Sequence, residues 1–226
     1  ARKHRIVGNA ALLRAFDRWA QRTRIRFASI RTYPTPASIR ALTEDRFSYI
    51  EDDLYLSRAL PANPKAIRVP VIARARLREG NVEDLPRLMR IVSKTEWFNR
   101  FHRDPHISRR AADGVYLRWL ESGARKPDTH LTVLEVGGRA AGFVLWSTEK
   151  LRRAGAETLI GNQELVALNP RLRGKGLGQL LYAGALRAMA AAGVRIAWTG
   201  VAATNAAAIN CQMRLGFECN YATAVF

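Results

Sequence analysis

The 226-residue chain has only two cysteines, Cys211 and Cys219, and no Cys-x-x-Cys pair. A fold held together by several disulfides is therefore excluded, and so is a cysteine-based zinc site. Histidines are also few, and Pro105 disrupts the helix that His102 and His106 would need in order to bind a metal together. We expect free thiols in a reducing compartment and no metal site.

Long apolar runs are missing as well. No segment approaches the roughly 18 consecutive apolar residues of a membrane span, and the first residues, with Arg2, Lys3 and Arg5, lack the apolar core of a secretion signal. The sequence thus predicts a cytoplasmic protein without membrane contact. Because the chain begins with Ala1 and not with Met, we expect residues before it in the natural protein, and an export signal among them stays open.

Acidic residues are scarce, with 19 Asp and Glu against 37 Lys and Arg, which gives a formal net charge of +18. Such a field attracts anions, including nucleic acid, coenzyme A or a substrate with a pyrophosphate, and it disfavours a polycationic acceptor such as an aminoglycoside. The arginines are spread along the chain without a long basic block, so nucleic acid is the weaker of these partners. A hydrophobic content of 48% is enough for a substantial core and argues against disorder.

The apolar periodicity divides the chain into two units. Residues 1–64 are expected to form a small α/β lobe that contains a helix capped by Asn9, a strand over 25–30, a short helix capped by Thr35 and a strand over 47–60. Residues 65–226 form the second, more complete unit. Its expected elements are a strand over 69–77, a helix with Pro86 in its first turn, a helix over 109–122, a hairpin over 130–147 turning at Gly137 and Gly138, a polar loop, a strand over 164–168, a helix over 177–192, a strand over 195–201, a helix over 205–215 and a strand over 217–226.

A glycine-rich turn links the strand over 164–168 to the helix that follows it. Unpaired main-chain N–H groups at a helix N-terminus are suited to hold a phosphate, and glycines allow it to come close. The turn matches neither the P-loop pattern nor the Gly-x-Gly-x-x-Gly pattern of dinucleotide-binding folds.

The turn resembles the Arg/Gln-x-x-Gly-x-Gly/Ala signature of the GNAT N-acetyltransferase superfamily. The matching residues are Arg173, Gly176 and Gly178, followed by Asn205, Ala208, Gly216 and Phe217 further along. Over residues 69–226 the order of elements also resembles that superfamily. The resemblance implies an α/β (α+β) acyl-CoA N-acyltransferase fold with a mixed, mostly antiparallel sheet, here preceded by a partial α/β lobe. It also implies acetyl-CoA as co-substrate and a primary amine as acceptor.

The resemblance further assigns coenzyme-binding residues. These are the main-chain groups of Val166 and Leu168, the amides of Arg173, Gly174, Lys175, Gly176, Leu177 and Gly178, and the side chain of Asn205. The strand over 164–168 is expected to splay from its neighbour, so that its free N–H groups polarise the thioester carbonyl.

The chain departs from the family at the residue that usually protonates the leaving thiolate. Five residues before Phe217, where the family has Tyr, stands Gln212. An amide donates a hydrogen bond but no proton at neutral pH, while a thiol with a pKa near ~8.5 can leave unprotonated. Tyr221 and Cys211 are candidate substitutes.

Glu164 is the candidate general base, because a carboxylate in an apolar strand is costly without a partner or a role. A position facing solvent or an arginine is an equal alternative for this side chain. Asp104 and Glu135 are weaker candidates for the base.

Two short segments, 100–104 and 116–122, resemble the dTDP-fucosamine N-acetyltransferase group. This implies a nucleotide-linked amino sugar as acceptor and Arg100, Phe101 and Asp104 as substrate-binding residues. The nearby aromatics Trp97, Phe98 and Trp119 frame the acceptor pocket or belong to the core. Protein or peptide N-acetylation, and a catalytically impaired protein that binds acyl-CoA or nucleic acid, stay open, as does a homodimer.

Overall fold

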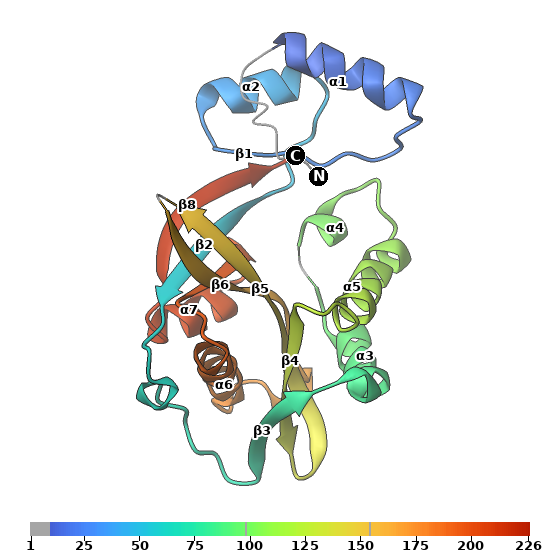
Figure 1. Ribbon diagram of the computed structural model, residues 1–226. Coiled ribbons are helices and arrows are strands. Elements are labelled where there is room, and N and C mark those ends of the chain that lie inside the picture. The colour runs from blue at the N-terminus through green and yellow to red at the C-terminus, as the bar shows by residue number, and fades with distance from the viewer. Residues whose placement is uncertain (1–9, 98, 154) are drawn as a thin grey trace.

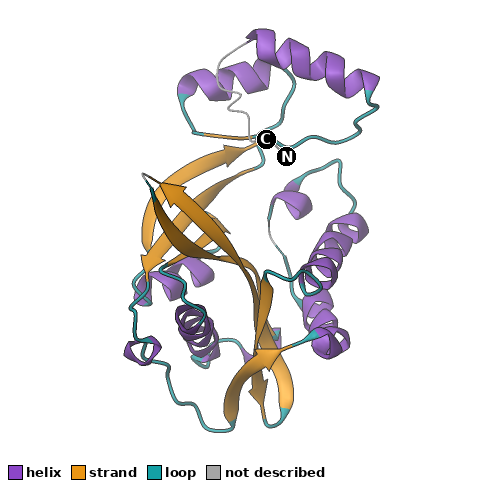
Figure 2. Cartoon of the chain, in the orientation of Figure 1, coloured by secondary structure: helices purple, strands orange, loops and turns teal. Residues whose placement is uncertain are grey.

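One twisted sheet of eight strands runs through the molecule, with helices on both faces (Figures 1 and 2). The computed structural model describes residues 10–97, 99–153 and 155–226. Its strands are β1 (Arg31–Thr32), β2 (Glu51–Ala59), β3 (Ala75–Gly80), β4 (Thr129–Val136), β5 (Arg139–Arg153), β6 (Ala156–Leu168), β7 (Ile196–Ala202) and β8 (Glu218–Val225). Its helices are α1 (Ala10–Arg22), α2 (Pro36–Glu44), α3 (Leu85–Lys94), α4 (Arg100–Arg103), α5 (Arg109–Gly123), α6 (Leu177–Ala191) and α7 (Ala206–Arg214).

The strand order is β1-β8-β2-β7-β6-β5-β4-β3, and the pair β6–β7 is parallel while the other described pairs are antiparallel. This confirms the predicted mixed, mostly antiparallel sheet. The hairpin between β4 and β5 turns at Gly137 and Gly138, as predicted, and both glycines have the positive φ that such a turn requires.

The two faces of the sheet carry separate cores, which we call the α6 face and the α5 face. On β5, Val144 and Trp146 pack toward α6, while Phe143 and Leu145 pack toward α3 and α5. Successive side chains of a strand point to opposite faces, so a strand buried on both sides has a continuous apolar sequence. Within the described residues, no helix is both long and apolar enough to cross a membrane.

The helices α1 and α2 lie beyond the end of β8 and cover a small core of Leu13, Ile30, Leu42, Ala224 and Phe226 (Figure 1). The predicted cap of α2 is confirmed: the side chain of Thr35 accepts a hydrogen bond from the N–H of Ser38, and Pro36 is the first helical residue. The predicted cap at Asn9 lies outside the described residues.

The expected strand over 25–30 is wrong. Ile25 and Phe27 are 41% and 49% exposed, and the ladder with β8 begins only at the main chain of Ile30, which bonds to Phe226. An apolar pattern alone does not make a strand where no neighbouring strand is available to pair with it.

Strand β2 lies between β7 and β8 and is antiparallel to both. Leu54, for example, is opposite Val201 on one side and Ala222 on the other. The predicted lobe of residues 1–64 therefore contributes a strand to the same sheet as residues 65–226. The division at residue 64 stays a prediction.

Three further boundaries differ from the sequence analysis. The predicted polar loop before residue 164 is a long hairpin, because β5 and β6 pair continuously from Thr148 and Gly161 to the turn. On its surface Glu157 forms ion pairs with Lys150 at 2.8 Å and Arg152 at 3.0 Å. Polar residues here mark two solvated strands. The strand expected over 69–77 is β3, which begins only at Ala75, and the aromatic segment expected as a loop over 97–105 contains the short helix α4.

Candidate functional site

The sheet opens between β6 and β7. Their parallel pairing ends at Gln163 and Thr199. Beyond this point β6 continues to Leu168 paired only with β5 among the described strands, and β7 continues paired only with β2. The N–H and C=O groups of residues 164–168 that point toward β7 therefore have no strand partner there. Val166 and Leu168 both lie in this segment, with their side chains in the core of the α6 face.

Glu164 is the extra residue of a β-bulge at the start of this opening. Leu145 is opposite Leu165, whereas the next residue of β5, Trp146, is opposite Gln163. A bulge turns one more side chain to a given face, and Glu164 reaches α5, where its Oε2 accepts a hydrogen bond from Trp119 Nε1 at 3.1 Å. Within the described chain its Oε1 has no hydrogen-bond partner, and the residue is half-buried. A carboxylate oxygen is thus available on the α5 face.

The glycine-rich turn leads from β6 into α6. Gly174 and Gly176 have φ values of 76° and 75°, a left-handed conformation that favours glycine. A Cβ added at Gly174 or Gly178 would meet no atom within 4 Å, so the surface of the turn is open. No side chain caps α6 at Gly176, which leaves the first N–H groups of the helix free for an anion.

Cations surround this turn. Arg171, Arg173 and Lys175 are exposed, and none of them forms an ion pair with an acidic side chain of the described residues. Their charges add to the positive end of the helix dipole.

Gln212 is buried, at 2% exposure, and its Nε2 donates a long hydrogen bond of 3.5 Å to Gln163 Oε1. The remaining polar atoms of the pair, Gln163 Nε2 and Gln212 Oε1, are buried without a hydrogen-bond partner in the described part of the chain. Gln163 is the last residue of β6 that pairs with β7. Sequence analysis missed Gln163, because the residue lies in the segment expected as a polar loop and its polar neighbours give no sign that it is buried.

The candidate substitutes for the missing tyrosine lie in different places. Cys211 precedes Gln212 on α7, and burial raises the pKa of its thiol. Tyr221 lies opposite Tyr55 on the α5 face, and their rings stack at a centroid distance of 4.7 Å. Burial also raises the pKa of Tyr221. Because Gln212 contacts the α6 face of β6, the side chains of Tyr221 and Gln212 lie on opposite faces of the sheet.

Asn205 is the N-cap of α7, and its side chain accepts a hydrogen bond from the N–H of Ala208 at 3.2 Å. The residue is exposed. Its side-chain oxygen therefore holds the start of α7, and the amide nitrogen is the group left for a ligand.

The predicted substrate residues lie on α4 and directly after it. The N–H of Arg100 donates to Glu51 Oε1 of β2 at 2.7 Å, and the Arg100 guanidinium lies over the ring of Phe101 at 4.4 Å. Asp104 Oδ1 accepts the N–H of His106 at 2.8 Å. The carboxylate of Asp104 thus supports its own loop.

Aromatic rings line the α5 face between α4 and Glu164. Trp97 and Tyr116 are stacked at 4.2 Å, Tyr116 also contacts Trp119, and Trp97 Nε1 donates to the carbonyl of Val92. Phe98 lies outside the described residues. These rings are part of the core under α3 and α5, and the ring of Trp119 extends from that core to Glu164.

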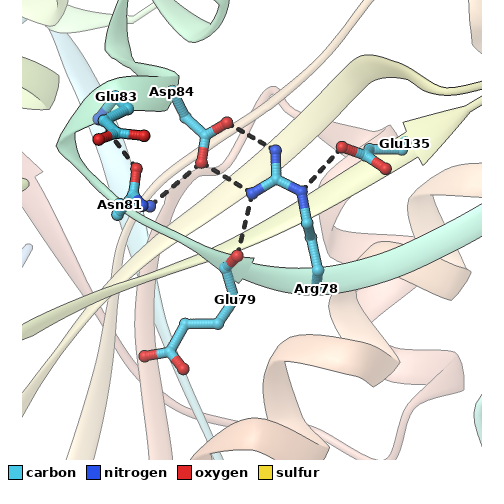
Figure 3. Close-up of polar contacts among 6 residues, drawn as sticks. All are labelled: Arg78, Glu79, Asn81, Glu83, Asp84 and Glu135. Carbon is cyan, nitrogen blue, oxygen red and sulfur yellow. Dashed lines mark hydrogen bonds and ion pairs between the residues drawn. The ribbon is translucent and has the colours of Figure 1, made fainter.

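Glu135, the weaker candidate for the base, belongs to an ion-pair network at the β3–β4 end of the sheet (Figure 3). Arg78 contacts Glu135 at 2.7 Å and Asp84 at 2.6 Å, and these contacts hold the pKa of Asp84 below its usual value. Asp84 also accepts the N–H of Asn81. The charge of Glu135 is therefore balanced by Arg78, and the ion pair between β3 and β4 accounts for its presence.

Residues 92–217, more than half of the chain, match the acetyltransferase (GNAT) family. The chain belongs to this family. Solved structures with the same fold include a GCN5-related N-acetyltransferase from Kribbella flavida, with a TM-score of 0.63 and 17% identity over 97% of this chain and 77% of that one. Another is a tandem GNAT protein from the clavulanic acid biosynthesis pathway, with a TM-score of 0.62 and 20% identity over 98% of this chain and 70% of that one.

At these identities the similarity establishes the GNAT fold alone. This chain spans 62% of the length of a putative GNAT acetyltransferase from Novosphingobium aromaticivorans, which matches it with a TM-score of 0.49 and 19% identity over 77% of this chain. No curated protein sequence matches it.

GNAT proteins are acyltransferases that use acetyl-CoA, and the residues at the opening fit that molecule. The turn offers the N–H groups of residues 174–178, left-handed glycines, open space and unpaired cations to a pyrophosphate. The predicted amide of Arg173 is not among them, because its N–H donates to the carbonyl of Pro170 at 3.3 Å. The edge of β6 after Gln163 offers main-chain partners to the amides of the pantetheine arm. Among the described residues, no group of three His, Cys, Asp or Glu side chains is placed to hold a metal ion.

Proposed function

We propose that this GNAT domain transfers an acetyl group from acetyl-CoA to a primary amine that approaches Glu164 from the α5 face. The observation that carries the proposal is the position of Glu164. The bulge turns its carboxylate to the α5 face at the point where β6 and β7 separate. Acetyl-CoA bound at the turn on the α6 face would extend its thioester into the same gap.

The coenzyme is held mainly by main-chain groups in this proposal. The amides from Gly174 to Gly178 bind the pyrophosphate beside the side chain of Arg173, the edge of β6 at Val166 and Leu168 binds the pantetheine arm, and Asn205 contacts the coenzyme through its amide nitrogen. An N–H of β6 that points into the gap donates to the thioester carbonyl oxygen as negative charge develops on it.

Glu164 removes a proton from the acceptor ammonium, directly or through a water molecule. Trp119 fixes the orientation of the carboxylate by donating to Oε2, so that Oε1 points to the acceptor. The neutral amine then forms the new C–N bond with the carbonyl carbon, its nitrogen releases a second proton to water, and the C–S bond breaks.

The departing sulfur receives a hydrogen bond at most from Gln212, because an amide does not supply a proton at neutral pH. Since the pKa of a thiol is about 8.5, the thiolate can leave and take its proton from water. Cys211, adjacent on α7, and Tyr221, on the opposite face, stay proposals for a proton donor.

A nucleotide-linked amino sugar is the acceptor that we propose first, as in the dTDP-fucosamine N-acetyltransferase group. It is supported by the formal charge of +18, which attracts a diphosphate, and by the location of Arg100 and Phe101 on the same face as Glu164. A protein or peptide amine is the alternative. A cytoplasmic location belongs to the same proposal, and both cysteines are free.

The test is to incubate the protein with acetyl-CoA and a panel of amines and to follow the release of free thiol. The panel contains a nucleotide-linked 4-amino sugar, the corresponding free amino sugar and a lysine-containing peptide. Binding of coenzyme A is measured separately by calorimetry. Thiol release with an amine supports the proposal, whereas bound coenzyme with no release from any amine argues against an active transferase.

Gln212 is the specific observation that favours a second function, an acyl-CoA-binding protein that has lost catalysis. The variant Gln212→Tyr separates the two. A large rise in turnover indicates an enzyme slowed by the missing proton donor. Retained coenzyme binding with no turnover in either protein favours the binder.

A further inference from the structure

Arg100 is an incompletely paired cation on the α5 face. Its side chain is 21% exposed, and its one carboxylate contact among the described residues is Asp53 Oδ2 at 3.9 Å, which is beyond hydrogen-bond distance. The ring of Phe101 covers one side of the guanidinium. A guanidinium has five N–H donors, and withdrawing it from water without acceptors is costly.

A second guanidinium shares the same carboxylate. Arg31 of β1 donates to Asp53 Oδ2 at 3.0 Å. Burial lowers the pKa of Arg100, and the nearby charge of Arg31 lowers it further. Two arginines thus converge on one carboxylate oxygen, which leaves a positive excess at this point.

Glu51 does not remove that excess. Its residue exposure is 3%, its Oε1 is used by the N–H of Arg100, and its Oε2 has no hydrogen bond in the described chain and lies 3.7 Å from Arg103. Arg103 is thus a third cation of the cluster, so the carboxylate of Glu51 does not offset the charges of Arg31 and Arg100. The main effect of Glu51 is to fix α4 against β2, which places Arg100.

This cluster is connected to the candidate base through aromatic rings. Arg100 lies over the ring of Phe101 at 4.4 Å, and Phe101 contacts the ring of Tyr116, which is 5% exposed, at 6.1 Å. Tyr116 in turn contacts the ring of Trp119 at 6.1 Å, and Trp119 donates to Glu164. The rings of Phe101, Tyr116 and Trp119 therefore link the arginines to the carboxylate that would receive the acceptor amine.

From this arrangement we infer that the acceptor carries an anionic group, a carboxylate or a phosphate, which Arg31 and Arg100 bind while its amine lies at Glu164. This inference rests on the proposed function. Guanidinium groups bind both anions through paired N–H donors. The cluster draws its residues from β1, β2 and α4, so the N-terminal 60 residues take part in choosing the acceptor.

The experiment compares amines that differ only in the anion. Glucosamine 6-phosphate is paired with glucosamine, and 6-aminohexanoate is paired with its amide, so that the two arms distinguish phosphate from carboxylate and each amine can reach past the aromatic rings. We expect kcat/KM to be at least tenfold higher for the anionic member of one pair. Arg100→Met should abolish that ratio and Arg100→Lys should retain part of it, while Arg40→Met, which removes an exposed arginine of α2, should leave it unchanged.

Binding measurements keep a misfolded variant from being misread. Each variant is checked for thermal unfolding and coenzyme A affinity, and inorganic phosphate is titrated into protein saturated with coenzyme A, so that the glycine-rich turn is occupied. Phosphate binding that is lost in Arg100→Met supports the inference.

These experiments distinguish failure of the anion site from failure of the proposed function. Equal turnover within both pairs, or phosphate binding that Arg100→Met leaves unchanged, overturns the anion site and leaves the acetyltransferase proposal intact. No turnover of any amine overturns the proposed function, and the phosphate titration then decides the anion site by itself.

Discussion

The two faces of the sheet contribute to the candidate site in different ways. On the α6 face most of the groups offered are main-chain amides from one continuous stretch, residues 165–178, to which α7 adds the side chains of Asn205 and Gln212. On the α5 face they are side chains from β1, β2, α4, α5 and β6. The α6 face thus suits a ligand common to a whole family, whereas the α5 face can change with single substitutions.

The largest expected effect comes from Glu164→Gln, which tests whether the two faces act independently. We expect kcat/KM for an accepted amine to fall by about 10²–10⁴, the range for loss of a general base, with coenzyme A affinity unchanged. The matched variant Trp119→Phe keeps an aromatic ring but removes the hydrogen bond to Glu164 and part of the contact with Tyr116, and it should cost less. Steady-state kinetics and coenzyme titration measure both quantities, and activity of Glu164→Gln within threefold of the parent protein would remove Glu164 as the base.

Gly176→Val is the corresponding change on the α6 face. Gly176 has φ 75°, and a left-handed backbone costs a side-chain-bearing residue about 1–2 kcal/mol. The turn of the variant leaves this conformation when no coenzyme is bound, and restoring it on binding costs the same free energy. Since 1.4 kcal/mol is a factor of ten in affinity, we expect coenzyme A to bind about tenfold more weakly or worse, whichever amine is used. Calorimetric titration provides the measurement.

The control for that variant is Gly138→Val. Gly138 has φ 74° in the β4–β5 turn, and a Cβ there would meet nothing within 4 Å. It carries the same backbone strain away from the opening, so thermal stability should fall while coenzyme affinity is kept. Equal loss of affinity in both variants would indicate a general loss of folding.

The buried amide pair of Gln163 and Gln212 sharpens the comparison, since it is a side-chain feature on the α6 face. Gln212→Leu leaves the amide of Gln163 buried without its partner, and we expect a loss of about 1–3 kcal/mol of unfolding free energy. The double variant Gln163→Leu/Gln212→Leu should lose less than the sum of the single changes. Urea unfolding of the four proteins gives the coupling energy, and strict additivity would show that the 3.5 Å contact contributes nothing.

The smallest effect is expected for Glu51→Gln on the α5 face. Burial raises the folded-state pKa of Glu51 above its unfolded value, so the native protein binds the extra proton between the two pKa values and loses stability as pH rises through that window. Glutamine keeps an oxygen for the N–H of Arg100 without the charge. We expect a higher Tm than the parent protein at pH 7, by no more than a few degrees, since about 1 kcal/mol corresponds to 2–4 °C for a domain of this size.

Below the unfolded pKa of glutamate, near ~4.3, the Tm difference between Glu51→Gln and the parent should disappear. A difference that stays constant across the pH range would show that the charge of Glu51 is not its cause.

The difference between groups that are contiguous in the sequence and groups brought together from distant elements also explains what the sequence could predict. The turn over 173–178, the strand before it and the helix after it are contiguous, so local patterns are enough to predict the fold family, whereas coenzyme binding at this turn stays a prediction. Thr35 and the Gly137-Gly138 turn were predicted correctly for the same reason, because a cap or a turn is defined within four residues.

The parts that were missed depend on distant partners. The strand expected over 25–30 is absent because no neighbouring strand pairs with it. The polar segment before Glu164 is a hairpin because β6 pairs with β5, and Glu157 forms ion pairs with Lys150 and Arg152 across that ladder. Arg31, Glu51 and Asp53 carry no local signal at all. Their importance arises when β1 and β2 bring them to α4, which no periodicity within residues 31–59 reveals.

The position of β2 has a consequence for the order of folding. Its partners β7 and β8 are made late, and Ser57 bonds to Asn220 across a separation of 163 residues. Closing so long a loop before any contact compensates for the lost chain entropy slows folding. Until β7 and β8 have been synthesised, β2 has no described strand to pair with, and a partly folded chain with an unpaired strand edge is prone to aggregate.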